Sequence, residues 1–373
     1  MNDYKIYENI LAGRPASDNN WRLNSMSIED MKKKAFLTPS DKIKSVSEGN
    51  RVTVFGASGF VGSRLCEMLK ENGYIVDAPT RGACDCLYRD EVIEYFSSQG
   101  TIYQNRYIVN LAAFVGGIGL NKTYPYDMGM INAKIGINIL DGILEHSRIF
   151  SMPLPKLIQV GTVCMYPCVP PVIPFEECDL WAGRPEVTNE PYGLAKKFIG
   201  FMAQCAHDQY GLQIVNLIPT NMYGPGDDFS DHASHVIPAM IKKIYVAHRD
   251  KRKLELWGDG SPSREFLFVD DFCRSVIAAI RSENEVANSG EFINVGTRVE
   301  TKMHDLVTMI VEAFGYNNMQ VEWDATKPNG QPRRALDCQQ SEKWLGHKST
   351  TKLADGLKIT VQWFLENIAP LIK

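Results

Sequence analysis

Residues 51–62 read RVTVFGASGFVG, and this stretch decides the fold. Residues 51–55 have the composition of a short buried strand, and residues 60–69 continue with the apolar spacing of a helix. The glycines therefore fall where a strand turns into a helix. Glycine permits that tight turn and lets a dinucleotide pyrophosphate approach the positive end of the helix. The stretch predicts a dinucleotide site formed by Gly56, Ser58, Gly59, Phe60, Val61 and Gly62.

Strands and helices alternate from this turn to about residue 250. The predicted strands are at 52–55, 74–78, 107–111, 156–160 and 213–218. The predicted helices between them are at 60–72, 88–98, 125–149 and 191–210. This alternation predicts an α/β fold built on a doubly wound parallel Rossmann sheet, with the ligand at the carboxyl ends of the strands.

The C-terminal third of the chain is more mixed. Helices are predicted near 234–248, 270–283, 302–315 and 351–367, and short strands near 254–257, 265–268, 291–295 and 320–323. Such a mixture suits a smaller α/β lobe that closes over a substrate. The expected division is an N-terminal extension at 1–50, a dinucleotide-binding domain at 51–225 and a substrate-binding lobe at 226–373, with some segments crossing between the lobes. The sequence does not choose between a packed arm and a partner-binding role for the extension.

The segment Tyr192-Gly193-Leu194-Ala195-Lys196 carries a possible proton donor. Positions i and i+4 share one face of a helix, so the Lys196 ammonium is expected to stand beside the Tyr192 phenol and lower its pKa. Of fifteen tyrosines only Tyr192 has a lysine four residues on, although a solvated pair would show the same spacing. Together with the upstream G-x-x-G-x-x-G turn, the segment resembles the extended short-chain dehydrogenase/reductase superfamily, which acts on nucleotide sugars.

Five sequence blocks make the resemblance more specific. They are AAFVGGI at 112–118, EPYGLAK at 190–196, PTNMYGP at 219–225, SHVIP at 234–238 and WGDG at 257–260. Their order and spacing over roughly residues 51–365 are similar to those of the GDP-L-fucose synthase family. The resemblance implies a homodimeric enzyme that epimerises a GDP-4-keto-6-deoxy sugar at C3 and C5 and then reduces C4 with NADPH.

The resemblance also implies catalytic roles for five residues. Cys164 and His235 match the acid/base pair of the epimerisation, and both side-chain types exchange protons near neutral pH. Tyr192 matches the proton donor of the reduction, Lys196 the residue that holds the phenol and the nicotinamide ribose, and Thr162 a hydrogen-bonding partner of the sugar. The plainer alternatives are a small buried thiol for Cys164 and a space-filling ring for His235.

The chain departs from the family at two positions beside these residues. Thr162 and Val163 stand where the family has serines. Threonine keeps the hydroxyl and adds a methyl group, whereas valine removes the hydroxyl. These departures leave open whether the substrate is the usual 6-deoxy hexose and whether both epimerisations are retained. The alternatives are a C4 reductase that does not epimerise, and a redox-neutral enzyme such as GDP-mannose 3,5-epimerase, which the chain also resembles through its cysteine-containing block. A non-catalytic dinucleotide sensor is a more distant alternative, against which the Tyr192/Lys196 pair argues.

The residue after the second predicted strand indicates the cofactor. An acidic side chain there would hold the ribose hydroxyls of NAD, whereas an arginine accommodates the 2′-phosphate of NADP. Arg81 lies where the family has an arginine, and Asp77 comes a little early. We predict NADP, with Ala112 as a further contact implied by the resemblance. NAD stays open, because Ser58 replaces an arginine that is frequent in the family's glycine turn.

Seven further positions are implied to bind the GDP-sugar. Cationic side chains neutralise a diphosphate and tryptophan offers a stacking face, although Trp257 could equally be core and Lys243 a solvated helix residue. The predicted substrate contacts are Val115, Gly116, Asn221, Lys243, Trp257, Arg264 and Lys327.

The composition agrees with such an enzyme. Charged residues make up 23% of the 373 residues and the net charge is −4, which does not indicate a nucleic-acid surface. No apolar run reaches the roughly 20 residues that span a bilayer, and the N-terminal sequence does not have the order of a signal peptide. The nine cysteines lack paired C-x-x-C zinc spacing, so no metal site is predicted and reduced thiols are expected. A cytoplasmic location follows.

Overall fold

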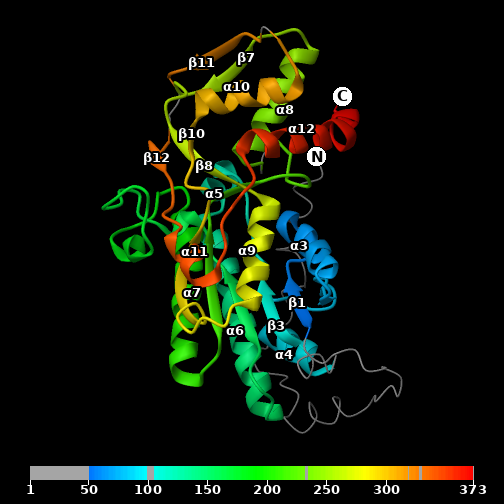
Figure 1. Ribbon diagram of the computed structural model, residues 1–373, viewed down its shortest axis with the longest axis vertical. Coiled ribbons are helices and arrows are strands. Elements are labelled where there is room, and N and C mark those ends of the chain that lie inside the picture. Colours follow the sequence, from blue (N-terminus) through cyan, green and yellow to red (C-terminus); the bar gives the residue numbers. More distant parts are fainter. Residues whose placement is uncertain (1–49, 99–104, 232–233, 318, 327–329, 373) are drawn as a thin grey trace, which may run out of the picture.

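The computed structural model describes residues 50–98, 105–231, 234–317, 319–326 and 330–372 (Figure 1). All but the last residue of the predicted N-terminal extension, and the predicted substrate residue Lys327, lie outside the described residues.

A parallel sheet of six strands forms the centre of the larger lobe. Its spatial order is β2-β1-β3-β4-β5-β9. The strands are β1 (Arg51–Phe55), β2 (Ile75–Asp77), β3 (Asn105–Asn110), β4 (Lys156–Val160), β5 (Ile214–Pro219) and β9 (Ser289–Val295). The interior strands β4 and β5 are buried along their whole length, as expected for a parallel sheet covered on both faces. The predicted doubly wound sheet is confirmed.

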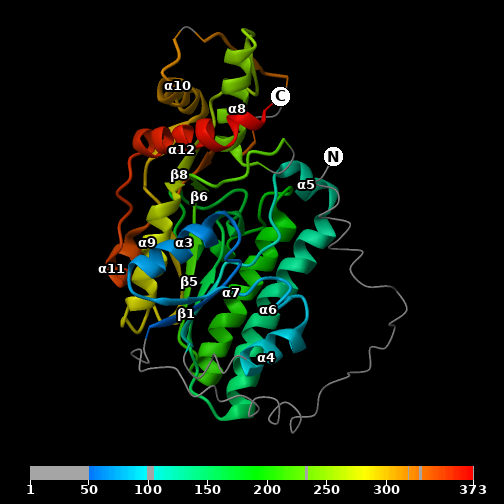
Figure 2. The same ribbon diagram turned by 90° about the vertical axis from the view of Figure 1, so that its right-hand side faces the viewer.

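Helices cover both faces of this sheet (Figure 2). One face carries α3 (Phe60–Glu71) and α9 (Val269–Arg281), whose apolar sides pack on residues of β1, β4 and β5. The other carries α4 (Arg89–Ser98), α6 (Pro125–Phe150) and α7 (Glu190–Tyr210). The helices α6 and α7 approach closely, since an added Cβ at Gly136 would stand 2.3 Å from Ile199 Cδ1.

A smaller lobe with its own hydrophobic core stands at the upper end of the molecule in Figure 1. Its helices are α8 (Val236–Arg249), α10 (Met303–Phe314) and α12 (Leu353–Asn367), and its parallel strand pair is β7 (Leu254–Trp257) with β11 (Val321–Asp324). These elements agree with the predicted ones to within a few residues.

A third, small sheet lies between the two lobes and comes from strands that the periodicity does not predict, apart from β8. It contains β6 (Asn221–Tyr223), β8 (Ser263–Phe268), β10 (Glu300–Lys302) and β12 (Arg333–Arg334). The chain returns from this sheet to the larger lobe twice, through α9 and β9 and then through α11 (Gln339–Leu345), which packs against both. Within the described part of the chain, no helix is both long and apolar enough to cross a bilayer.

Candidate functional site

The glycine turn after β1 has the geometry of a phosphate cradle. Gly56 has a φ of 81°, and an added Cβ there would stand 2.7 Å from the Ala112 nitrogen. At Gly62 an added Cβ would stand 2.1 Å from the Gly56 carbonyl oxygen. Only glycine fits either position, so the backbone stays open toward the N-terminus of α3, where the helix dipole favours an anion. The turn therefore fits the pyrophosphate of the predicted dinucleotide, beside Ala112.

The side chains after β2 favour the phosphorylated dinucleotide. Asp77 Oδ2 already accepts hydrogen bonds from Tyr95 Oη at 2.5 Å and from Thr53 Oγ1 at 3.4 Å. One oxygen of its carboxylate is thus already engaged within the protein. Arg81 lies beyond it at the surface, with Nε 3.2 Å from Asp85 Oδ2. A guanidinium at this place can bind a 2′-phosphate with charge-assisted hydrogen bonds.

Arg81→Ala should weaken NADPH binding about tenfold or more and leave NADH binding nearly unchanged, because a hydrogen bond to a charged group contributes about 1.5–3 kcal/mol. Fluorescence titration of both dinucleotides measures this. Equal affinities for NADPH and NADH in the unaltered enzyme, with no effect of the substitution, would contradict the assignment.

A short helical turn, η1 (Val163–Met165), follows β4 and carries the predicted thiol. Thr162 Oγ1 accepts a hydrogen bond from the Cys164 nitrogen at 3.2 Å and so fixes the turn. The Thr162 hydroxyl uses a lone pair here, which leaves its O–H able to donate to another acceptor. Val163 is 3% exposed and packs in a hydrophobic cluster with Met165. Its side chain is therefore directed into the core, and the loss of a hydroxyl at this position does not remove a group from the site.

The helix α7 brings Tyr192 and Lys196 to the same turn. An added Cβ at Gly193 would stand 2.2 Å from the Cys164 carbonyl oxygen, so a glycine beside Tyr192 permits the close approach. Lys196 is buried, and its Nζ donates a hydrogen bond to the Val160 carbonyl at 3.2 Å. Residues far apart in the sequence, 162–164 and 192–196, are therefore neighbours.

The predicted effect of Lys196 on Tyr192 is wrong in this structure. Burial raises the pKa of Tyr192 well above its ordinary value, and the nearby Cys164 adds to the rise. Burial also lowers the pKa of Lys196 to about 8. Removal from water penalises the charged form of each side chain. Tyr192 is thus held as a neutral phenol, which is the form that donates a proton.

Two arginines surround the Cys164 thiol. Arg334 Nη1 lies 3.8 Å from Cys164 Sγ. Arg264, a predicted substrate residue, is half-buried. Burial lowers its pKa to about 10; the charge of Arg334 also lowers this pKa, whereas Cys164 raises it. The site is therefore positively charged. Arg334 is a functional candidate that sequence reasoning missed; its only signal is the doubled arginine that begins six residues after Lys327.

The predicted histidine, His235, is on a different element, directly before the N-terminus of α8. His235 Nδ1 is 3.7 Å from Asp227 Oδ1, and 54% of its side chain is exposed. The Asp227 carboxylate raises the pKa of His235 and so keeps the imidazolium protonated to higher pH. Asp227 itself is buried, and sequence reasoning does not identify it. Among the described residues, no hydrogen bond or ion pair joins His235 to the Cys164 turn.

The remaining predicted substrate residues are placed in different ways. Val115 is 49% exposed in the loop after β3, and Asn132, which the sequence pattern does not single out, fixes this loop by bonding the Phe114 nitrogen and carbonyl at 3.0 and 2.8 Å. Asn221 Nδ2 donates to the Glu265 carbonyl at 3.0 Å and so joins β6 to β8. Gly116 is closely packed, with no room for a side chain, and Lys243 is exposed. Trp257 is 69% exposed and is therefore not a core residue.

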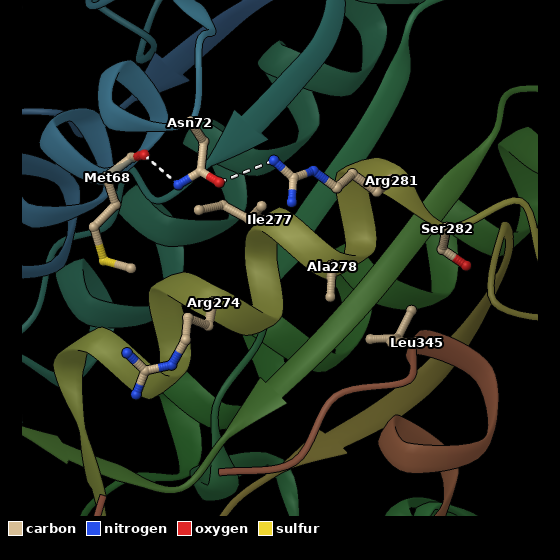
Figure 3. Close-up of a pocket in the computed structure, with 8 residues that line it drawn as sticks. All are labelled: Met68, Asn72, Arg274, Ile277, Ala278, Arg281, Ser282 and Leu345. Carbon is tan, nitrogen blue, oxygen red and sulfur yellow. Dashed lines mark hydrogen bonds between the residues drawn. The ribbon is translucent and has the colours of Figure 1, made fainter. Parts of the chain in front are cut away.

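A cavity of about 530 Å³ lies away from all these residues, against α3, α9 and α11 (Figure 3). Its two arginines are engaged: Arg281 Nη2 donates to Asn72 Oδ1 at 2.9 Å, and Arg274 forms an ion pair with Asp271. Cavity size therefore does not identify the site, which is recognised from its side chains.

Comparison with known proteins places the chain among nucleotide-sugar enzymes. Residues 52–296 match the NAD dependent epimerase/dehydratase family. The GDP-L-fucose synthase of Escherichia coli strain K12 is 35% identical over 85% of this chain and 97% of its own length. GDP-L-fucose synthase 1 of Arabidopsis thaliana is 32% identical over 89% of this chain and 98% of its own. The structure of a GDP-L-fucose synthetase from Naegleria fowleri bound to NADP superposes with a TM-score of 0.75, at 23% identity over 88% of this chain and 98% of that chain.

Proposed function

Because the chain belongs to the GDP-L-fucose synthase group of the NAD dependent epimerase/dehydratase family, we propose that it epimerises a GDP-4-keto-6-deoxy sugar at C3 and C5 and reduces it at C4. It is an NADP-dependent enzyme of the extended short-chain dehydrogenase/reductase type. The observation that carries the proposal is the cluster at η1, where a thiol, a neutral phenol and two guanidinium groups meet beside the end of β4.

The epimerisation would use Cys164 and His235. The 4-keto group acidifies the protons at C3 and C5, so inversion needs a base on one face of the ring and an acid on the other. Cys164 lies beside the guanidinium of Arg334 and near that of Arg264, and it is the base in this proposal. His235 is kept protonated by Asp227, and it is the acid that returns a proton to carbon.

The reduction would use the neighbouring residues on α7 and η1. NADPH, when bound along the glycine turn, supplies the hydride for C4. Tyr192, held as a neutral phenol by burial, donates the proton to O4. The Thr162 hydroxyl hydrogen-bonds the sugar oxygen, and Lys196 orients the phenol and the ribose. Arg264 and Trp257 would grip the diphosphate and the base, with Lys243, Asn221, Val115 and Gly116 as further contacts.

Hydrogen exchange tests the proposal directly. The enzyme is incubated in D₂O with GDP-4-keto-6-deoxy-mannose and without reduced cofactor, and the sugar is analysed by mass spectrometry and NMR. We expect deuterium at both C3 and C5, followed by stoichiometric oxidation of NADPH once it is added. Reduction without prior exchange would instead establish a C4 reductase, and exchange without NADPH oxidation a redox-neutral epimerase.

We further propose a homodimer that pairs α6 and α7 with their counterparts in a second copy. Tyr126 and Met130 on α6, and Leu194, Phe198 and Phe201 on α7, are 38–73% exposed. The spacings i, i+4 and i, i+4, i+7 place them in one stripe on each helix, and the two helices are packed side by side. A contiguous apolar face of this kind indicates an interface.

A cytoplasmic location is part of the proposal, and the free state of all nine cysteines supports it.

Phe198→Glu should convert the dimer to a monomer, raising the dissociation constant roughly 30-fold or more, since loss of a central aromatic contact costs about 2 kcal/mol. Light scattering after size exclusion measures the mass. Leu371→Glu, at a residue 74% exposed near the C-terminus, is the matched control and should leave the mass unchanged. A monomeric unaltered enzyme would contradict the proposal.

A further inference from the structure

We propose that Arg334, oriented by Gln331, is a positioning residue that directs its guanidinium at the Cys164 sulfur and stabilises the thiolate that the epimerisation requires. This inference rests on the proposed function for the role of the thiolate, but the charge state of the thiol can be measured without any sugar. Arg334 acts through Cys164 and donates no proton itself.

The guanidinium of Arg334 is fixed by a fork of hydrogen bonds. Its Nε and Nη2 donate to Gln331 Oε1 at 3.1 and 2.8 Å, which leaves Nη1 directed at Cys164 Sγ, 3.8 Å away. Gln331 is in turn held by its Nε2, which donates to the Cys168 carbonyl at 2.9 Å. Because both the oxygen and the nitrogen of the Gln331 amide form hydrogen bonds, the Arg334 side chain is held in one orientation.

The strand register places Arg334 beside a second arginine, Arg264. In the parallel pairing of β12 with β8, Arg334 is the register partner of Arg264. Two like charges at paired positions repel and destabilise a sheet. The charge of Arg334 contributes to lowering the pKa of Arg264, whereas Cys164 contributes to raising it. A thiolate at Cys164 offsets the repulsion between the two arginines.

The other groups that face Cys164 do not oppose a thiolate. Tyr192 is kept neutral by burial and carries no charge at neutral pH. The Thr162 hydroxyl is engaged with the Cys164 nitrogen. Within the described part of the chain, the charged groups that act on Cys164 are Arg264 and Arg334. In the epimerisation the thiolate takes the proton of C3 or C5 and becomes a thiol, the C–H electron pair passes into the enolate, and both arginines stay protonated.

The pH profile of cysteine alkylation tests the proposal. The full chain is treated with iodoacetamide between pH 5 and 10, and the rate at each cysteine is followed by peptide mass spectrometry. The variants are Arg334→Met, Arg334→Lys and Gln331→Leu. Arg333→Met is the matched control, because Arg333 is the neighbouring residue of β12 but its Nε bonds Glu300 Oε2 at 3.0 Å instead. The exposed Cys178 reports in every sample on the reagent and on folding.

Arg334→Met should move the midpoint of the Cys164 profile up by about one pH unit, the usual effect of removing one nearby opposite charge. Arg334→Lys should restore part of the shift, and Gln331→Leu should reproduce part of the loss. A Cys164 profile that Arg334→Met and Gln331→Leu leave unchanged, with Arg334→Met raising only the KM for the GDP-sugar, overturns the proposal and makes Arg334 a diphosphate contact. A variant that also changes the alkylation rate of Cys178 is misfolded. If Arg334→Met is misfolded in this way, the profiles of Gln331→Leu and Arg334→Lys test the proposal instead. If the unaltered enzyme exchanges no deuterium into the sugar, the proposed function is refuted, but the effect of Arg334 on the alkylation profile of Cys164 still stands.

Discussion

Tyr192→Phe should lower kcat for reduction of the 4-keto sugar by roughly 10²- to 10⁴-fold, which is the usual contribution of a positioned general acid. The phenylalanine ring keeps the packing of α7 against the Cys164 turn but removes the only group of this side chain that can protonate O4. Burial holds Tyr192 as a phenol, so the unaltered enzyme has its proton available over the whole physiological range. NADPH oxidation under saturating sugar measures the change.

Three further results make this prediction specific. Dinucleotide binding should stay nearly intact, and so should deuterium exchange at C3 and C5, because the phenol belongs to the reduction alone. Tyr210→Phe, at an exposed residue at the end of the same helix, should have no effect. Unchanged turnover in Tyr192→Phe would remove the tyrosine from the mechanism, and equal loss of exchange and reduction would show a structural defect instead.

Cys164→Ser should reduce deuterium exchange at C3 and C5 by roughly 10²- to 10³-fold. Serine keeps the size and shape of the side chain, but its alcohol is a far weaker acid and base near pH 7 than a thiol. The hydrogen bond from the residue-164 nitrogen to Thr162 Oγ1 is retained, since the backbone makes it. The measurement is mass spectrometry of the sugar after timed incubation in D₂O.

The reduction of a sugar that is already epimerised serves as the companion measurement. It should fall much less than exchange does, because Tyr192, Lys196 and Thr162 are untouched. Cys178→Ser, at an exposed thiol, is the matched control and should leave both activities unchanged. If exchange persists in Cys164→Ser at the rate of the unaltered enzyme, another base removes the ring protons and Cys164 is a packing residue.

The sequence by itself determined the central sheet, its helices and the class of chemistry. The periods of the apolar residues differ between strands and helices, and that local signal was enough to place β1 to β5 and the helices α3, α4, α6 and α7 within a few residues. The glycine turn and the Tyr192-x-x-x-Lys196 spacing are also local, so the sequence alone predicts the cofactor site and the proton donor that we propose. Family blocks added Cys164 and His235.

Only the tertiary structure decided which distant residues share a site and what state they are in. Strands as short as β6 and β12 have no readable period, and they are ordered by pairing with β8, which brings Arg334 of the C-terminal third to Cys164. The pKa of Tyr192 is likewise not a property of its helix, because burial by surrounding segments outweighs the lysine one turn away. Asp227 beside His235 is a further pairing of this kind. Desolvation and charge depend on everything packed around a group, and a linear pattern does not contain that information.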